Sequence, residues 1–293
     1  MSSIEYIKTN IQWYPGHMTK ARRMIEENIP LVDAVCEIRD ARIPYSSGNP
    51  DIKTLSEGKP RLIIINRIDL ADPAITSKWV EYFENDGAKV ILTDAKSGKG
   101  VDSFIPAIKS LLRDKIQSYE LKGQSGRSLR VMILGVPNVG KSTFINKVAK
   151  RKVAIAGDKP GVTRGKQWIS IDKGIDLLDT PGILWPKFES QEVGELLAVT
   201  NAIKIDVFDV ETLAANFMTR LSHYYPEAIT KRYGVIPDSS LNGYELLESC
   251  AKKRGMIVSK NEYDIDRMAH TLLNEYHEGK LGRLSLEDPN DIS

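Results

Sequence analysis

The chain has 293 residues, which suits two domains, and 41% of them are hydrophobic, which is ample for a core. No apolar run approaches a membrane span, so we expect no membrane partner. The only two cysteines are Cys36, in a strand-like run, and Cys250, in a helix-like run, so we expect reduced, buried thiols. The net charge is only +2. Because only two cysteines are present and the N-terminus lacks a signal pattern, we expect a cytoplasmic protein, and we expect it to be a monomer.

The chain begins with a segment, residues 1–21, that we expect to form a mobile arm. It contains the run Trp13-Tyr14-Pro15-Gly16-His17-Met18-Thr19-Lys20-Ala21. The next segment runs from Asp33 to Pro44 and reads Asp33-Ala34-Val35-Cys36-Glu37-Ile38-Arg39-Asp40-Ala41-Arg42-Ile43-Pro44. Its apolar part, around Cys36, is typical of a strand.

A buried strand is predicted from Arg61 to Ile65, followed by Asn66-Arg67-Ile68-Asp69. This tetrapeptide resembles the guanine-specificity element of translation-factor-class GTPases, which is usually Asn-Lys-x-Asp. The Asp69 carboxylate can accept hydrogens from the ring N–H and the exocyclic amine of guanine, whereas ATP would leave it unpaired. We expect Asn66 to tie this loop to the phosphate loop and the base, and the aliphatic stem of Arg67 to lie over the base.

The next predicted strand, Lys89 to Leu92, runs into Thr93-Asp94-Ala95-Lys96-Ser97. This run resembles the last guanine-binding loop of GTPases, in which a backbone N–H donates to the guanine oxygen. Asp94 stands where a serine is usual. We therefore predict that Asp94 and Ala95 bind the nucleotide, and that the polar, glycine-rich residues 122–128 form a link to the next element.

The run Gly135-Val136-Pro137-Asn138-Val139-Gly140-Lys141-Ser142-Thr143 matches the phosphate-binding pattern G-x-x-x-x-G-K-[ST]. A strand is predicted before it, from Leu129 to Leu134, and a helix from Thr143 onward, which is the context that the pattern needs. Glycines let backbone N–H groups turn toward phosphate oxygens at the positive end of the helix. Lys141 would reach the β- and γ-phosphates, and the Ser142 hydroxyl would ligate Mg²⁺.

Two further elements predict the remainder of a magnesium–phosphate site. A short apolar run, Ile175 to Leu178, ends in Asp179-Thr180-Pro181-Gly182. Asp179 can hold Mg²⁺ through water, and the Gly182 N–H can approach the γ-phosphate closely. In the loop between the phosphate pattern and this run, Thr163 is the candidate hydroxyl that completes the Mg²⁺ shell when a γ-phosphate is present.

The remaining residues, 187–293, read mainly as helices, because apolar residues such as Leu196-Leu197 and Leu246-Leu247 recur at helical spacing. Pro226 and Gly255 mark breaks, and we expect the last dozen residues to fray. Basic residues number 12 and acidic residues 18 in this part, which excludes a uniformly basic RNA clamp. The local patches Lys231-Arg232 and Lys252-Lys253-Arg254 are candidates for RNA contact.

The order of these motifs is unusual. Conventional GTPases run from the phosphate loop to the guanine-specificity element, whereas here the guanine-reading elements come first. The same doubly wound, mostly parallel sheet can be built in either order, because ligands gather at the carboxyl ends of its strands. We therefore predict a circularly permuted α/β P-loop GTPase domain over residues 22–186. Its second switch, the loop that carries Gly182, leads into a smaller all-helical domain over 187–293.

The runs from Trp13 to Ala21 and from Asp33 to Pro44 match signatures of the RbgA/YlqF family of ribosome-assembly GTPases. With the loops above, the resemblance covers at least residues 11–186. It implies a GTPase that acts late in maturation of the large ribosomal subunit, with GTP or GDP and the precursor subunit and its rRNA as partners. It also implies that the subunit stimulates hydrolysis.

The residue that positions the attacking water is not obvious. Many GTPases have a glutamine directly after the glycine of the Asp-x-x-Gly motif, but Ile183 stands there and cannot orient water. His17 is the best candidate, since an imidazole can orient or accept from water, and the family resemblance implies the same residue. The alternative is that His17 bonds locally or contacts RNA.

Two further expectations concern ions and RNA. In related GTPases an asparagine at the position of Asn138 helps to hold K⁺ against the phosphates; the alternative is that it only favours the loop conformation. Basic residues also gather between Lys147 and Lys166, near Thr163. Such a run is either a solvated face or a contact with RNA phosphates.

Other functional classes remain open at this stage. A metabolic kinase or ATPase could use the same phosphate loop, and Asp69 argues against it. A non-catalytic RNA-binding scaffold could retain GTP as a structural ligand with negligible hydrolysis. Ile183 favours this scaffold, whereas Lys141, Thr163 and Asp179 argue against it.

Overall fold

The computed structural model describes residues 18–124, 126–152, 167–172, 174–180, 182, 184, 190–238, 240–259 and 262–292. The chain folds into two compact units. The described residues between 18 and 184 form one unit together with 287–292, and we call it the sheet unit. Residues 190–286 form the other, the helical unit.

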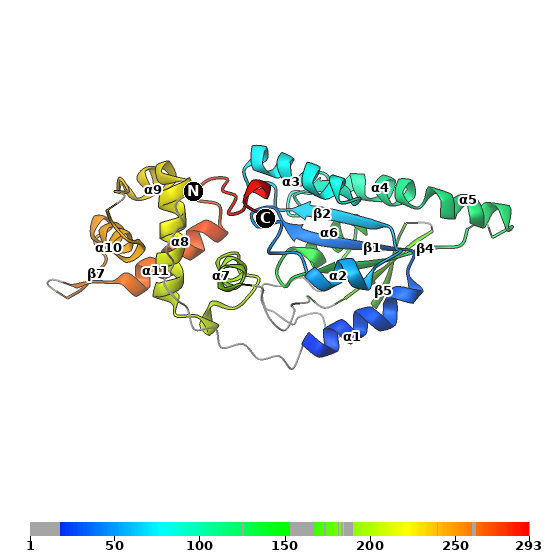
Figure 1. Ribbon diagram of the computed structural model, residues 1–293, viewed down its shortest axis with the longest axis horizontal. Coiled ribbons are helices and arrows are strands. Elements are labelled where there is room, and N and C mark those ends of the chain that lie inside the picture. Colours follow the sequence, from blue (N-terminus) through cyan, green and yellow to red (C-terminus); the bar gives the residue numbers. More distant parts are fainter. Residues whose placement is uncertain are drawn as a thin grey trace. The chain divides into compact units, whose positions relative to one another are not determined.

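The sheet unit is built on a six-stranded sheet in the order β3-β2-β1-β4-β6-β5 (Figure 1). The strands are β1 (Ala34–Asp40), β2 (Arg61–Asn66), β3 (Lys89–Thr93), β4 (Leu129–Gly135), β5 (Gln167–Asp172) and β6 (Ile175–Asp179). All neighbouring strands are parallel except β5, which runs antiparallel to β6 at the edge. The strands predicted at 61–65, 89–92, 129–134 and 175–178 are confirmed, each ending one residue later than expected.

The sheet order confirms the permuted α/β fold. Strand β1 pairs with β2 on one side and with β4 on the other, with Ile38 opposite both Ile64 and Gly135. Strand β2 leads into residues 66–69, which we call the guanine loop, and strand β4 leads into residues 135–143, which we call the phosphate loop. These two strands are therefore separated by one strand only. Because all three run in the same direction, the loops that follow them emerge at the same edge of the sheet.

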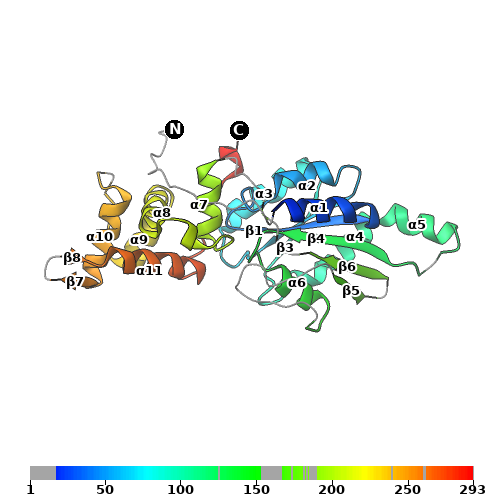
Figure 2. The same cartoon turned by 90° about the horizontal axis from the view of Figure 1, so that it is seen from below.

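Helices cover both faces of the sheet (Figure 2). On one face lie α1 (Met18–Asn28), α2 (Pro50–Leu55) and α3 (Pro73–Asn85), whose apolar side chains pack on β1, β2, β4 and β6. On the other lie α4 (Phe104–Leu111) and α6 (Lys141–Val148), where the rings of Phe104 and Phe144 meet edge to face at 5.3 Å. Helix α5 (Arg113–Leu121) follows α4 and has no buried residue.

Local sequence signals begin several of these helices. Asn49 caps α2 and Asp72 caps α3, each accepting a hydrogen bond from a backbone N–H of the first turn. Proline follows each cap, at the first helical position, where its missing N–H costs nothing. Both cysteines are buried and free, as expected, and burial raises the pKa of Cys250 to about 12.

The helical unit is organised around α8 (Val210–Tyr224), which contacts the other helices of the unit. These are α7 (Gln191–Val199), α9 (Pro226–Tyr233), α10 (Gly243–Lys253) and α11 (Ile265–His277). Pro226 begins α9, and Gly255 follows α10 with φ of 65°, so both predicted breaks are confirmed. The unit is not wholly helical, because β7 (Ile257–Ser259) and β8 (Glu262–Tyr263) form an antiparallel pair.

The end of the chain differs from the expectation. The helical unit ends at Leu286, which is buried, and Glu287 to Ile292 pack on the sheet unit. They include a short 3-10 helix, Pro289–Asp291, so these residues do not fray. Further 3-10 turns lie at Ile29–Leu31, Val101–Ser103 and Ile205–Val207. No helix in the described part of the chain is long and apolar enough to cross a membrane.

Candidate nucleotide site

The phosphate loop joins the end of β4 to the start of α6. Its backbone takes left-handed values at Asn138, with φ of 58°, and at Gly140, with φ of 96°. A Cβ on residue 140 would lie 2.4 Å from Asn66 Nδ2, so only glycine fits where the two loops meet. Val139 and Lys141 are buried, while Ser142 and Thr143 are half-buried in the first turn of α6.

Asn66 joins the guanine loop to the phosphate loop. Its amide Nδ2 donates to Val139 O at 2.9 Å, and its Oδ1 accepts from Thr93 Oγ1 at 3.1 Å and from Ala95 N–H at 2.9 Å. The side chain is 2% exposed, so these hydrogen bonds satisfy polar atoms that water does not reach. One amide therefore connects the loops that follow β2, β3 and β4.

Arg67 makes a second link between the same loops. Its backbone is left-handed, with φ of 64°, and its Nη2 donates to Asn138 O at 2.5 Å. A lysine could supply such a donor as well, so the arginine keeps this contact where the related loops have lysine. Asp69, two residues later, has an exposed side chain.

Asp94 shapes the last loop of the site. Its Oδ1 accepts hydrogen bonds from Lys96 N–H at 2.9 Å and Ser97 N–H at 3.2 Å. Burial acts to raise the pKa of Asp94, but the hydrogen bonds from Ser97 and Lys96 outweigh it and the pKa lies below its ordinary value. The carboxylate thus holds the turn beside Ala95, which accounts for aspartate at this position.

Lys141 and Asp179 form a buried ion pair between the start of α6 and the end of β6. Their side chains are 6% and 2% exposed. Burial lowers the pKa of Lys141, and the neighbouring carboxylate of Asp179 opposes that effect. The hydroxyl of Ser142 and the carboxylate of Asp179 are oxygen ligands of the kind that Mg²⁺ prefers, so this end of the site fits a magnesium ion.

The segment after β6 lies directly against the phosphate loop. Thr180 is buried and donates from Oγ1 to Ile133 O at 2.8 Å, which ties it to β4. A Cβ on residue 182 would lie 2.9 Å from Pro137 Cα, so the close approach requires Gly182. Gly182 therefore packs directly on the phosphate loop.

Some of the predicted site residues lie outside the described part of the chain. They are His17, Thr163 and Ile183, together with Lys159, Arg164 and Lys166 of the basic run. Its other members, Lys147, Lys150, Arg151 and Lys152, are exposed. His277, in the helical unit, forms a hydrogen bond through Nε2 with Val199 O at 2.7 Å.

The structure also adds a residue for which sequence analysis predicts no role. Asp40, at the end of β1, is buried, and its carboxylate accepts three hydrogen bonds from Arg42, at 3.0 Å from the backbone N–H, 2.9 Å from Nε and 2.8 Å from Nη2. Asp40 Oδ2 also lies 3.7 Å from Arg67 Nη1. The sequence feature that could have indicated a role for Asp40 is an aspartate directly after a strand-like run, because ligands bind at that edge of the sheet.

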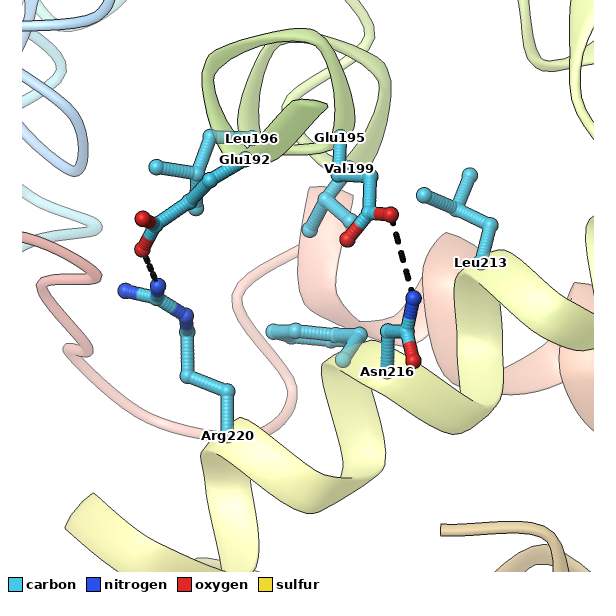
Figure 3. Close-up of a pocket in the computed structure, with 8 residues that line it drawn as sticks. Glu192, Glu195, Leu196, Val199, Leu213, Asn216 and Arg220 are labelled. Atoms are coloured by element: carbon cyan, nitrogen blue, oxygen red, sulfur yellow. Dashed lines mark hydrogen bonds and ion pairs between the residues drawn. The ribbon is translucent and has the colours of Figure 1, made fainter. Parts of the chain in front are cut away.

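A small hollow in the helical unit is separate from these loops (Figure 3). It lies between α7 and α8, and its charged groups pair with one another. Arg220 forms an ion pair with Glu192, and Asn216 Nδ2 donates to Glu195 Oε1 at 3.0 Å. Its polar groups thus serve the packing of α7 on α8.

Comparison with known proteins identifies the family. A family model described as 50S ribosome-binding GTPase matches residues 130–231. The match takes in the phosphate loop and the run from Asp179 to Gly182. It leaves out the guanine loop at residues 66–69, which precedes them in this chain.

Ribosome biogenesis GTPase A of Priestia megaterium is 42% identical to this chain over 96% of its length and 98% of the relative's. The Thermotoga maritima protein of that name is 33% identical over 97% of this chain and 96% of the relative's length. The solved GDP-bound structure of TM YlqF has 30% identity and a TM-score of 0.64, and covers 92% of this chain and 100% of its own. The solved structure of GNP-bound YlqF from T. maritima has 32% identity and a TM-score of 0.62, and covers 93% of this chain and 100% of its own.

The relatives match along nearly the whole chain, and the solved structures share its fold. The loops described above lie within the matched length. The chain belongs to the ribosome biogenesis GTPase A family, RbgA/YlqF, and is a ribosome-assembly GTPase that binds GTP and GDP and hydrolyses GTP with the Mg²⁺ that GTPases generally use.

Proposed function

We propose that the protein binds one GTP across the guanine and phosphate loops and hydrolyses it on the maturing large ribosomal subunit, in a late assembly step. The observation that carries the nucleotide site is the hydrogen bond from Asn66 to Val139, which joins the two loops. The large subunit is favoured by the name of the matching family model, 50S ribosome-binding GTPase. A monomer in the cytoplasm is part of this proposal.

In this site Asp69 accepts the ring N–H and amine hydrogens of guanine, and Lys141 binds the β- and γ-phosphates. Nucleotide phosphates would form ion pairs with Lys141 in place of Asp179, so that Asp179 would be released from the buried ion pair. The Ala95 N–H donates to Asn66 in this structure, and we expect it to be shared with the guanine oxygen. The N–H groups from Asn138 to Thr143 surround the phosphates.

Two metal ions enter the proposal. Ser142, Asp179 and Thr163 would hold Mg²⁺, which would supply positive charge to the β- and γ-phosphates. Asn138 would help to hold K⁺, which would supply the positive charge that an arginine gives in other GTPases. The left-handed backbone of Asn138 is also a property that asparagine tolerates by itself, so its role needs a direct test.

His17 positions the attacking water, since Ile183, which follows Gly182, carries no polar group. This assignment rests on the sequence, because both residues lie outside the described part of the chain. We propose that the ribosomal subunit stimulates hydrolysis by fixing the arm that carries His17.

The helical unit offers a basic surface to rRNA. Arg232 and Arg254 both form ion pairs with Glu275, at 2.6 Å and 3.1 Å, so the ends of α9 and α10 lie together. The two basic patches of the sequence thus form one surface. Its exposed lysines, which we call the lysine surface, are Lys231, Lys252 and Lys253.

The second switch transmits the state of the nucleotide to the helical unit. Gly182 packs on Pro137 of the phosphate loop, and the chain then leads into α7. Loss of the γ-phosphate would relax this segment and change how the helical unit is held. Hydrogen exchange in α7 and α8 should therefore differ between the protein bound to a GTP analogue and the protein bound to GDP; identical exchange would refute the coupling.

The proposal is tested by co-sedimentation with large-subunit precursors in the presence of a non-hydrolysable GTP analogue or GDP. We expect binding with the analogue and release with GDP. A variant with glutamine at Lys231, Lys252 and Lys253 should bind less, with a flatter dependence on salt, whereas Lys280→Gln in the same unit should not. Equal binding in both nucleotide states without ribosome-stimulated hydrolysis would favour the scaffold alternative.

A further inference from the structure

The last residues that the structure describes, 287–292, which we call the C-terminal segment, hold the turn that follows β1. The carboxylate of Glu287 accepts hydrogen bonds from the backbone N–H of Tyr45, at 2.7 Å, and of Ser46, at 3.0 Å. Ser46 is 3% exposed. Because hydrogen bonds to a carboxylate are among the stronger ones in proteins, Glu287 fixes the backbone of this turn.

Other contacts hold Glu287 itself in one position. The indole Nε1 of Trp79 donates to Glu287 O at 3.2 Å, and Lys78 Nζ lies 2.6 Å from Asp288 Oδ2. Ile292 packs against the apolar cluster that contains Trp79. These contacts anchor the C-terminal segment on the sheet unit.

The turn that Glu287 holds is tied in turn to Asp40. Ser47 Oγ accepts a hydrogen bond from Asp40 N–H at 2.9 Å and donates to Ile43 O at 2.6 Å. Ser47 and Asp40 are 0% and 4% exposed, so neither contact is open to exchange with water. A shift of residues 45–47 would therefore move Asp40.

Asp40 faces the guanine loop through Arg67. Its carboxylate lies 3.7 Å from Arg67 Nη1, while Arg67 donates to Asn138 O of the phosphate loop. Burial acts to raise the pKa of Asp40, but the guanidinium groups of Arg42 and Arg67 outweigh it, so the pKa is lowered and the group is ionised at neutral pH. Asp40 is thus a fixed charge that orients the arginine joining the two loops.

We infer that Glu287 is a positioning residue for the guanine-nucleotide site: by holding residues 45–46 it keeps Asp40 against Arg67 and slows the release of GDP. The inference rests on the proposed nucleotide site. It gives the helical unit a second connection to that site, since residues 190–286 lie in the chain between β6 and Glu287. The first connection runs through Gly182, beside the phosphates, and the second acts beside the base.

The test measures the dissociation rate of N-methylanthraniloyl-GDP from the full-length protein with Mg²⁺, together with the melting temperature of each variant. Glu287→Ala should release the nucleotide about five to ten times faster, which is the size of typical coupling between sites. Glu287→Gln should release GDP at a rate between those of the wild type and Glu287→Ala, because its amide oxygen still accepts a hydrogen bond. The control, Asp291→Asn, changes an exposed carboxylate of the same segment that takes no part in the contacts described above, and should release GDP at the wild-type rate.

A double-mutant cycle separates positioning from general loss of structure. Arg67→Ala should accelerate release by itself, and adding Glu287→Ala should then change the rate less than twofold. If Glu287→Ala accelerates GDP release by the same factor with and without Arg67→Ala, the inference is overturned. Release at the wild-type rate from Glu287→Ala or Glu287→Gln would also overturn it. A different result tests the nucleotide site itself. If Asp69→Ala leaves GDP binding at its wild-type level, the proposed site is refuted, whatever the effect of Glu287.

Discussion

Asn66 Nδ2 donates a hydrogen bond to Val139 O at 2.9 Å, although the two residues are 73 positions apart in the sequence. This bond places the end of the guanine loop on the phosphate loop. It forms because β2 and β4 run parallel on either side of β1, so that the loops after them emerge at the same edge. The circular permutation changes the order of the loops along the chain and leaves this edge intact.

Asn66→Ala should weaken GDP binding by at least about tenfold and lower the melting temperature by several degrees. The substitution leaves Val139 O, Thr93 Oγ1 and Ala95 N–H without their partner, and each unsatisfied buried group costs about 1–3 kcal/mol. Nucleotide titration and thermal unfolding measure the two effects. Asn85→Ala, at the exposed end of α3, is the matched control and should change neither.

The pH dependence of the helical unit should depend on Glu275. Burial acts to raise its pKa, but hydrogen bonds from Arg232, Tyr233 and Arg254 outweigh that and lower the pKa to about 2, from an ordinary value of 4.5. Its stabilising contribution is therefore fully present above pH 4.5 and is lost as the pH falls toward 2.

Glu275→Gln should accordingly reduce the free energy of unfolding at pH 7 by on the order of 2 kcal/mol, the scale for hydrogen bonds to charged groups. It should also remove much of the acid sensitivity between pH 4.5 and 2. Urea unfolding followed by circular dichroism across that range is the measurement, with the exposed Glu278→Gln as control. An acid transition in Glu275→Gln identical to that of the wild type would refute the assignment.

His17→Ala should lose most of the GTP hydrolysis that ribosomal subunits stimulate, by about 10²–10⁴-fold, while nucleotide affinity stays within about twofold. Single-turnover hydrolysis with and without subunits measures the first, and fluorescence titration the second. His270→Ala, at a half-buried position on α11, should leave stimulated hydrolysis unchanged. Full stimulated turnover by His17→Ala would remove this residue from the mechanism.

Potassium should accelerate hydrolysis relative to sodium at equal ionic strength, and the difference should depend on Asn138. The matched variant is Asn138→Gly, because the left-handed backbone at this position, with φ of 58°, suits glycine without strain. The variant should hydrolyse GTP equally in either salt, at the sodium rate of the wild type. Equal rates in both salts for the wild-type protein would reject the ion.

Much of this fold could be predicted from sequence, because each loop of the site follows an apolar run of strand length. The runs before Asn66, Gly135 and Asp179 gave the positions of β2, β4 and β6 to within one residue. Residue chemistry then gave the expected roles of Asp69 and Lys141. Their contact with a bound nucleotide stays a prediction.

The rest depended on contacts between residues far apart in the sequence. Nothing local marks Glu287 as the partner of Tyr45, since a charged residue near the end of a chain is most often solvated. The role of Asp40 likewise needs the knowledge that β1 lies between β2 and β4. The β7–β8 pair was missed because its strands are short and mostly exposed, so they lack an apolar pattern.

The central claim is that Asp69 and Lys141 act on the two ends of one nucleotide. The most direct test is the hydrolysis of GTP and xanthosine triphosphate by Asp69→Asn and by Asp69→Asn combined with Lys141→Ala. Because an asparagine amide can donate to the second carbonyl of xanthine, we predict that Asp69→Asn loses GTP turnover and gains xanthosine triphosphate turnover, and that Lys141→Ala abolishes the gained activity. Unchanged preference for GTP in Asp69→Asn, or xanthosine triphosphate turnover that survives Lys141→Ala, would contradict the claim.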